Sequence, residues 1–269
     1  MIRWEGFRGR EWLVTPSDQA VRPIHPRLRA TLCGVDALYR PPIGFAHRGA
    51  RAQAPDNTIE SFELARRLGA SGLESDVWLT SDGIAVLDHD GLVRFGMRKR
   101  AISEVSRRQL PPHIPTLAEL YDRCGTDLAV SLDVKEDAAG PVAVAVARDA
   151  GAEEQLWLCH PELDVVASWR PLSDGVHLVD STRLRRIKEG PERRAARLAE
   201  LGVDAINMHA SDWTRGLTTL FHRFERLAFG WDAQQPRVLA TLLGIGIDAV
   251  YSDHVDRMME AITQLEPPT

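Results

Sequence analysis

Two carboxylates two positions apart, Glu74 and Asp76, lie within the apolar segment 72–79. If this segment is a β-strand, both side chains point to the same face of the sheet. Like charges this close repel each other unless a cation or an arginine lies between them, and hard divalent cations prefer carboxylate oxygens. The pair therefore indicates a cation site, although salt bridges to arginines of the fold would also satisfy it.

Histidines end two other apolar segments. His47 is followed by Arg48 and Gly49, and His89 follows the segment that begins at residue 84. An imidazole with a pKa near 6.5 can donate or accept a proton at neutral pH. Arginine is suited to bidentate contacts with phosphate, and glycine lets a substrate approach the backbone closely. Alone, however, His47 and Arg48 could be hydrogen-bonding residues at a strand end, and Asp88, His89 and Asp90 could be a plain loop entry.

The turn between two of these segments predicts how the groups meet. Asp82 and Gly83 form the signal of a two-residue β-hairpin turn. A turn closed at these residues pairs Asp76 with His89 across the hairpin. We therefore expect an acid and a histidine to converge there.

Asp133 and Lys135 end a further apolar segment and again share a strand face. Alone they could form an ordinary ion pair. Together with the other clusters they give three carboxylates, two histidines, an arginine and a lysine at the ends of apolar segments. This combination favours phosphodiester chemistry over unrelated structural contacts.

The composition limits the class of protein. The 269 residues carry 33 basic and 38 acidic side chains, a net charge of −5, and 44% of them are hydrophobic. These values indicate a globular protein and argue against a general nucleic-acid partner. No uncharged apolar stretch approaches the ~18 residues of a membrane helix, and the first residues lack the apolar block of a signal peptide. We expect a soluble cytoplasmic protein without stable membrane insertion.

Helix-forming segments that end at a glycine alternate with short apolar runs along the chain. Glycine just past a helix tolerates a positive φ, and apolar runs without alternation are typical of strands covered on both faces. The pattern predicts an α/β protein, a single (β/α)8 TIM barrel with an N-terminal arm. The expected strands are 43–47, 72–79, 84–89, 128–134, 155–158, 176–179, 205–208 and 227–231. A doubly wound sheet is the alternative, but the chain lacks the G-x-G-x-x-G sequence expected after its first strand.

Residues 1–42 precede the first expected strand and end in two prolines. We expect them to form an extension packed on the barrel, which would occupy residues 43–269.

Two basic stretches follow within the barrel. Residues 183–200 are expected to form the solvated face of an outer helix. The loop 94–108 is expected to face solvent and to overhang the barrel mouth, where it could attract an anionic substrate.

Residues 43 to about 255 resemble the glycerophosphodiester phosphodiesterase family. The family pattern is H-R-G, P-E-N-T, E-x-D-V, T-x-D-G, H-D, E-x-K, W-T-V-N and G-x-D-x-x-x-[ST]-D. The corresponding residues here are 47–49, 55–58, 74–77, 80–83, 89–90, 133–135, 231–234 and 246–253. The block from residue 47 to residue 90 is the most specific part of the resemblance.

The resemblance implies a TIM barrel that binds one divalent cation, Mg²⁺ or Ca²⁺, and hydrolyses a small phosphodiester to an alcohol and glycerol 3-phosphate. The implied metal ligands are Glu74, Asp76 and Asp133, and the implied general acid and base are His47 and His89. The implied substrate contacts are Arg48, Lys135 and Trp231. No nucleic-acid partner is implied, and no oligomeric state follows from the sequence.

The chain departs from the family pattern at a few positions. Asp56 and Asp133 stand where the family has glutamate, and Asp232 and Gln234 stand where it has threonine and asparagine. The related spider-venom sphingomyelinase D enzymes look similar and have D-x-K at the position of Asp133, which is compatible with a ligand role. The changes after Trp231 bear on head-group selectivity. The family's larger insertion after H-D is also shortened here, which leaves the loop 94–108 as the expected lid.

Two other functions stay open at this stage. One is lysophospholipase D-like hydrolysis of a lipid phosphodiester, which would require an apolar groove. The other is a non-catalytic barrel that binds a phosphate ligand, although such a barrel has no need of a paired acid and base. The nucleophile also stays open, since a neighbouring hydroxyl of the substrate or a water could attack phosphorus.

Overall fold

Eight short apolar runs pair side by side and close into a barrel. The computed structural model describes residues 37–265. The barrel strands are β1 (Ile43–His47), β2 (Gly72–Leu79), β6 (Ala129–Val134), β7 (Leu156–His160), β8 (His177–Ser181), β9 (Ala205–His209), β10 (Leu227–Trp231) and β11 (Ala249–Ser252). Their order is β1, β11, β10, β9, β8, β7, β6, β2, and a parallel pairing of β1 with β2 closes the ring. The predicted TIM barrel is confirmed, and most of the predicted extension, residues 1–36, lies outside the described residues.

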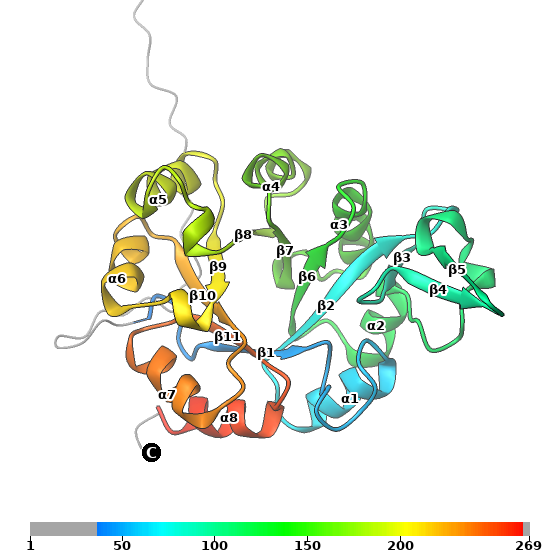
Figure 1. Cartoon of the computed structure of the whole chain (residues 1–269), viewed down its shortest axis with the longest axis horizontal. Helices are drawn as coiled ribbons and strands as arrows, with labels where there is room; N and C mark the ends of the chain where they lie inside the picture. Colours follow the sequence, from blue (N-terminus) through cyan, green and yellow to red (C-terminus); the bar gives the residue numbers. More distant parts are fainter. Residues whose placement is uncertain (1–36, 266–269) are drawn as a thin grey trace, which may run out of the picture.

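A helix covers the outside of the barrel after each of these strands or after the segment that extends it (Figure 1). The helices are α1 (Ile59–Arg67), α2 (Leu117–Cys124), α3 (Ala139–Asp149), α4 (Leu163–Ser168), α5 (Pro191–Glu200), α6 (Arg215–Arg223), α7 (Pro236–Gly244) and α8 (Val255–Thr263). The Thr58 side chain caps α1 by accepting the backbone N–H of Ser61, and Thr116 and Glu119 form a reciprocal capping box at α2. Within the described residues, no helix is long and apolar enough to cross a lipid bilayer.

Side chains on the two faces of the barrel strands form two apolar layers. One layer packs between the strands and the helices, and the other fills the barrel interior. In the interior the rings of Phe45 and Tyr251 stack at 4.8 Å, and Phe229 packs against Trp157 at 5.2 Å. These aromatic side chains form a packed interior beneath the polar groups at the strand ends.

One predicted strand has a different place from the one expected. The segment expected at 84–89 is β3 (Ala85–Leu87), which pairs antiparallel with β2 outside the ring, and the eighth barrel strand is β11 instead. The expected list of strands was wrong at this point, because a short apolar run reads the same whether it pairs in a hairpin or in a parallel barrel. Beyond β3, the hairpin of β4 (Leu92–Phe95) and β5 (Arg98–Ala101) projects beside the barrel (Figure 1).

The hairpin register also differs by one residue. Trp78 pairs with Val86, so Asp76 lies opposite Asp88 rather than His89, and the Asp88 N–H donates to the Asp76 carbonyl at 3.1 Å. The turn has three residues between Thr80 and Ile84, with Gly83 at a φ of 77°. A turn followed by a left-handed glycine adds one residue to the two-residue loop that was expected.

Candidate active site

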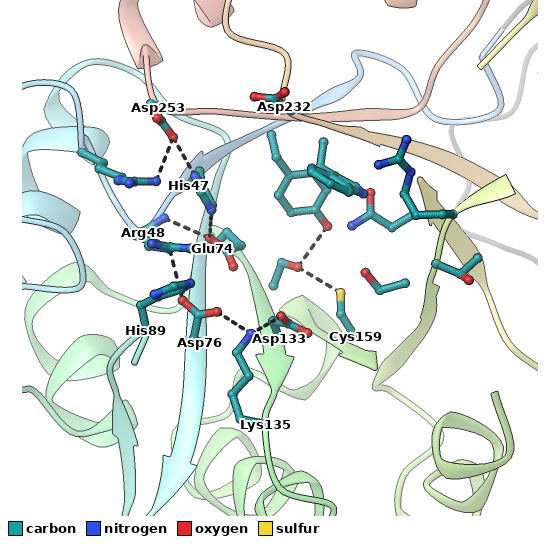
Figure 2. A pocket seen from close by; sticks show the side chains of 18 of the residues that line it. His47, Arg48, Glu74, Asp76, His89, Asp133, Lys135, Cys159, Asp232 and Asp253 are labelled. Atoms are coloured by element: carbon teal, nitrogen blue, oxygen red, sulfur yellow. Dashed lines mark hydrogen bonds and ion pairs between the residues drawn. The ribbon is translucent and has the colours of Figure 1, made fainter. Parts of the chain in front are cut away.

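A cavity of about 560 Å³ opens at the carboxyl ends of the barrel strands. All eight side chains predicted for the site line it, namely His47, Arg48, Glu74, Asp76, His89, Asp133, Lys135 and Trp231. Figure 2 shows the charged members of this set, from β1, β2, β6 and the loop after β3, around one part of the cavity. The fold thus brings together residues that are up to 184 positions apart, from 47 to 231.

His47 ends β1 and is held by an aspartate that the residue-by-residue prediction did not include. Its Nδ1 lies 2.6 Å from Oδ1 of Asp253, the residue just after β11, and its Nε2 lies 3.9 Å from Oε2 of Glu74. The hydrogen bond from His47 lowers the pKa of Asp253, so the carboxylate accepts the Nδ1–H. Burial would lower the pKa of His47, but the charge of Glu74 and the bond to Asp253 outweigh it and raise the pKa above 6.5. This arrangement leaves Nε2 to exchange a proton in the cavity.

Arg48 and Gly49 form a tight turn behind His47. Arg48 has a φ of 55°, and its backbone N–H donates to Oε2 of Glu74 at 2.9 Å. Gly49 has a φ of 80°, and a Cβ there would lie 2.2 Å from Oγ of Ser61. The third residue of the H-R-G motif must therefore be glycine for the turn to fit against α1.

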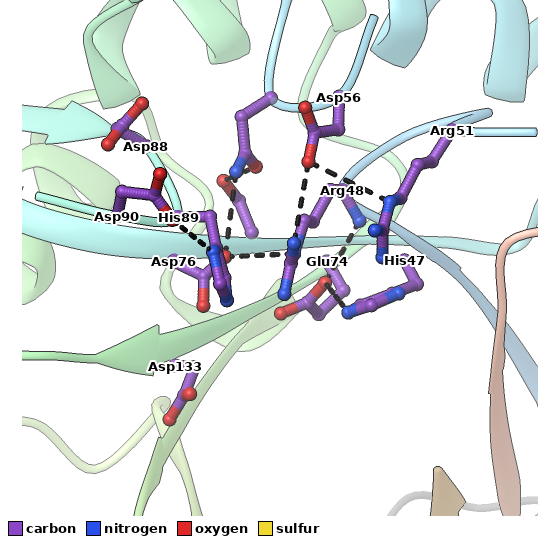
Figure 3. A network of polar contacts seen from close by, with 12 residues as sticks. His47, Arg48, Arg51, Asp56, Glu74, Asp76, Asp88, His89, Asp90 and Asp133 are labelled. Carbon is purple, nitrogen blue, oxygen red and sulfur yellow. Dashed lines mark hydrogen bonds and ion pairs between the residues drawn. The ribbon is translucent and has the colours of Figure 1, made fainter. Parts of the chain in front are cut away.

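The Arg48 guanidinium is fixed between two carboxylates. Its Nε lies 3.2 Å from Oδ2 of Asp76, and its Nη1 lies 3.4 Å from Oδ2 of Asp56 (Figure 3). Asp56 thus still contacts Arg48, although it is one methylene shorter than the glutamate of the family pattern. Asn57 adds a 3.5 Å contact from its Nδ2 to Asp76 and accepts a hydrogen bond from Ser75. The P-D-N-T segment therefore orients the arginine and the aspartate that face the cavity.

The three predicted metal ligands lie on two adjacent strands. Asp76 of β2 and Asp133 of β6 are register partners, and Glu74 lies two residues before Asp76. Burial, with the negative charges of Asp76 and Asp133 and against the lowering effect of His47, raises the pKa of Glu74 to about 7. A buried carboxyl whose neighbours raise its pKa lacks compensating positive charge at this point.

Lys135 supplies positive charge to the other two carboxylates. Its Nζ lies 2.8 Å from Oδ1 of Asp76 and also donates to Oδ2 of Asp133. No group of three or more His, Cys, Asp or Glu side chains in residues 37–265 has the arrangement of a metal site. The donor chemistry of Glu74, Asp76 and Asp133 nevertheless suits a hard cation, since all three present carboxylate oxygens to one cavity.

His89 lies on the same cavity but in a more open place than His47. It follows β3, and its Nδ1 lies 2.8 Å from Oδ1 of Asp90. Its side chain is 46% exposed, against 26% for His47. The two imidazoles therefore differ in surroundings, one held by a half-buried carboxylate and the other by an exposed one.

Trp231 ends β10 on the far side of the cavity from β2. Its ring meets His209 edge-on at 4.5 Å, and the Arg183 guanidinium lies over it at 5.5 Å from the ring centroid. His209 also lies 3.1 Å from Asp232, which follows Trp231. The tryptophan is thus packed between two basic side chains.

Sequence reasoning placed the basic residues of the mouth on the wrong segment. Arg183, Arg185 and Arg186 line the cavity from the turn after β8, whereas they were expected on a solvated helix. Conversely, none of the described residues that line the cavity comes from the loop 94–108, the expected lid. The error arose because the basic run begins before the helix: α5 starts only at Pro191.

Asn207 and Cys159 are further cavity residues that the sequence did not single out. Oδ1 of Asn207 is buried and has no hydrogen-bond partner among the described residues, so it is available to a donor in the cavity. Burial raises the pKa of the Cys159 thiol to about 12, which keeps it protonated at neutral pH. Cys159 is therefore unsuited to act as a nucleophile.

Comparison with known proteins gives one family. Residues 47–257 match the family model described as the glycerophosphoryl diester phosphodiesterase family. The mouse protein Glycerophosphodiester phosphodiesterase 1 is 31% identical over 138 residues, which cover 45% of this chain and 38% of the relative. Probable glycerophosphodiester phosphodiesterase 2 of Mycobacterium tuberculosis is 25% identical over 262 residues, which cover 82% of this chain and 90% of the relative. The match to the mouse protein thus spans less than half of that relative's length.

Solved structures with the same fold include phosphodiesterases. A phosphodiesterase from Oleispira antarctica, in complex with the product sn-glycerol-3-phosphate, has a TM-score of 0.73 and 22% identity, over 82% of this chain and 97% of that chain. The glycerophosphodiester phosphodiesterase of Thermotoga maritima has a TM-score of 0.70 and 21% identity, over 81% of this chain and 97% of that chain. At these identities the likeness establishes the barrel fold.

Proposed function

Because the chain belongs to the glycerophosphoryl diester phosphodiesterase family, we propose that its cavity hydrolyses a glycerophosphodiester to an alcohol and glycerol 3-phosphate. The observation that carries this proposal is the convergence of His47, His89 and three carboxylates on one cavity. A phosphodiester needs positive charge against its oxygens and a proton donor for its leaving group. The cavity offers both kinds of group within the reach of one small molecule.

We propose that Arg48 and Lys135 bind the phosphoryl oxygens. Arg48 is oriented by Asp56 and Asp76, and Lys135 lies between Asp76 and Asp133. Both side chains contact Asp76 of β2, and both line the cavity. Charges fixed in advance stabilise the developing negative charge on phosphorus oxygens without reorganisation.

A single divalent cation, Mg²⁺ or Ca²⁺, belongs to this proposal. Glu74, Asp76 and Asp133 would hold it, and it would supply positive charge to the phosphoryl oxygens. The raised pKa of Glu74 supports the assignment, because the protein leaves this buried carboxyl short of positive charge.

The histidines complete the proposed reaction. One neutral imidazole takes the proton of the nucleophile as its oxygen bonds to phosphorus, and the other, protonated, gives a proton to the alcohol oxygen as its bond to phosphorus breaks. The bond from Nδ1 of His47 to Asp253 fixes which nitrogen of His47 takes part. A neighbouring hydroxyl of the substrate and a water are both compatible nucleophiles.

The cavity lining favours a water-soluble diester over a lipid. Of the described residues that line it, only Cys159, Trp231 and Tyr251 have largely apolar side chains. A lipid phosphodiester would require an apolar surface for its chain. We therefore rank lysophospholipase D-like activity second.

Release of glycerol 3-phosphate tests this proposal. The purified chain would be incubated with glycerophosphoethanolamine, glycerophosphoserine, glycerophosphocholine and bis(p-nitrophenyl) phosphate, with Mg²⁺ or Ca²⁺ and with chelator. We expect turnover that chelation abolishes and added cation restores. Binding of glycerol 3-phosphate without turnover of any diester would instead indicate a non-catalytic phosphate-binding barrel.

A further inference from the structure

A second group of basic side chains faces the cavity across the barrel mouth from His47 and Arg48. Arg183, Arg185 and Arg186 lie in and beside the short 3-10 turn η5 (Leu184–Arg186), which follows β8. In the ring order, β8 is the fourth strand from β1 in both directions. The turn after β8 therefore lies opposite the histidine and arginine that end β1.

Arg183 anchors this turn and its charge is already compensated. Its Nε and Nη2 donate to Asp212 at 2.6 and 3.1 Å, and the Leu184 N–H donates to the same carboxylate at 3.1 Å. Asp212 thus fixes both the arginine and the backbone of the turn. The turn is held in place before any ligand arrives.

Arg185 and Arg186 differ from Arg183, Arg194 and Arg197 of the same stretch. Arg194 pairs with Asp180 and Glu189, and Arg197 pairs with Asp164. No carboxylate of the described residues lies within 4 Å of a guanidinium nitrogen of Arg185 or Arg186, although both side chains line the cavity. Two arginines without a carboxylate partner within 4 Å therefore line the cavity, and Arg186 also borders a neighbouring pocket lined by Glu162 and Asp164.

Two acidic groups on the other parts of the mouth, Asp232 and Asp253, have basic partners of their own. Asp232 lies 3.1 Å from Nε2 of His209, and Asp253 lies 2.6 Å from Nδ1 of His47. Arg183 covers the ring of Trp231, the aromatic side chain that could otherwise face a quaternary ammonium. This wall of the cavity consequently attracts anions and repels cations.

We infer that Arg185 and Arg186 form a subsite for a second negative charge on the alcohol that leaves. The inference rests on the proposed function and narrows its substrate class. If the scissile phosphate binds at Arg48 and Lys135, one of the two arms of the diester extends across the mouth toward the turn after β8, and the inference assigns this arm to the leaving alcohol. The preferred alcohol carries a carboxylate or a phosphate, groups that a pair of guanidinium forks binds well.

Two pairs of substrates that differ by one anionic group test this subsite. Glycerophosphoserine differs from glycerophosphoethanolamine by a carboxylate, and glycerophosphoinositol 4-phosphate differs from glycerophosphoinositol by a phosphate. We expect kcat/KM to be about tenfold or more higher for the anionic member of at least one pair, the scale of one charge-assisted hydrogen bond. The pair that shows the preference identifies the anionic group.

Two matched double variants distinguish the effect of charge at the subsite from the effect of the same charge elsewhere on the surface. In the double variant Arg185→Gln with Arg186→Gln, the ratio of kcat/KM for the anionic member of a pair to kcat/KM for the other member should fall close to one. Lys188→Gln with Arg193→Gln removes the same charge from exposed residues of the neighbouring segment that do not line the cavity, and it should keep the wild-type ratio. In the wild type the ratio should also fall as salt rises from low to high concentration, a measurement that needs no variant.

The outcomes distinguish this inference from the function it rests on. Equal kcat/KM for the two members of each pair, or a higher value for the less anionic member of both pairs, would overturn the subsite and leave the hydrolase intact. An equal loss of preference in both double variants would do the same. Failure to hydrolyse any of them, or bis(p-nitrophenyl) phosphate, would overturn the proposed function and the subsite with it.

Discussion

The contact between His47 and Asp253 determines how one of the two histidines can act. At 2.6 Å from Nδ1, the carboxylate holds the imidazole in one tautomer and favours its charged form. In the proposed reaction Asp253 acts through its hydrogen bond to the histidine, so it is a positioning residue. Its role should appear in the pH dependence of the reaction.

Replacing Asp253 with Asn should lower the pKa of His47, because a neutral amide stabilises the imidazolium less than a carboxylate does. We expect the limb of the kcat/KM profile that belongs to His47 to move to lower pH, with kcat reduced about tenfold to a hundredfold. Asp90→Asn, beside the exposed His89, is the matched control and should change the profile less, because solvent screens that pair. Identical profiles for wild type and Asp253→Asn would exclude the positioning role.

The raised pKa of Glu74 gives a second prediction for a single residue, on how protein stability depends on pH. Its pKa of about 7 in the folded protein exceeds the ordinary value of 4.5, so the folded state binds the extra proton between these values. The stability that this proton contributes is complete below pH 4.5 and is lost as pH rises through 7. In metal-free protein, Glu74→Gln should therefore have a Tm a few °C above wild type at pH 8 and little difference at pH 5, since 1 kcal/mol corresponds to about 2–4 °C for a domain of this size.

A divalent cation should reverse this effect. If Glu74 is a ligand, Mg²⁺ or Ca²⁺ should raise the Tm of the wild type more at pH 8 than at pH 5, and it should raise the Tm of Glu74→Gln less. Thermal unfolding with and without the cation measures both. A cation effect of the same size in wild type and variant would remove Glu74 from the ligand set.

At the scale of elements, the turn between β1 and α1 depends on one glycine. Gly49→Ala should destabilise the fold by about 2–4 kcal/mol, because it adds the strain of a positive φ to an overlap with Ser61. Gly69→Ala is the control, since Gly69 has a φ of 86° but nothing within 4 Å of an added Cβ, so it should lose only about 1–2 kcal/mol. Urea unfolding measures the difference. Equal losses would mean that the packing of Gly49 on α1 contributes nothing.

Most of the strands, and the charged residues at their ends, were predictable because each depends on a local pattern of the sequence: an apolar run that is followed by charged residues. Apolar runs such as 227–231 have few alternatives in an α/β chain, and this range matches β10. Residues such as Glu74 and Asp76 share a face whatever the neighbouring strand, since strand side chains alternate. All eight predicted site residues accordingly line one cavity.

Features that depend on turn length or on distant partners were not predictable in this way. The three-residue turn before Ile84 displaced the hairpin register by one, and nothing in the Asp82-Gly83 signal distinguishes it from a two-residue turn. The arginines after β8 could not be separated from the helix that follows, because Arg183 owes its place to Asp212, which is 29 positions away. Such a contact forms only when the neighbouring strands β8 and β9 pair.

At the scale of the whole molecule, closure of the ring converts strand ends into a site. The pairing of β1 with both β2 and β11 brings His47 next to Glu74 on one side and Asp253 on the other. A chain with a net charge of −5 thereby presents a cavity whose mouth carries several arginines. The local field at the mouth, rather than the net charge, governs how an anionic substrate approaches.

The turnover of His47→Ala tests the central claim most directly, with release of glycerol 3-phosphate from the best wild-type diester as the measurement. We expect kcat to fall about 10²–10⁴-fold, the contribution of a general acid or base, while thermal unfolding stays close to wild type. His113→Ala, which replaces an exposed histidine that does not line the cavity, should keep full activity. Turnover by His47→Ala at the wild-type rate would contradict the assignment of this cavity as the site of acid and base catalysis.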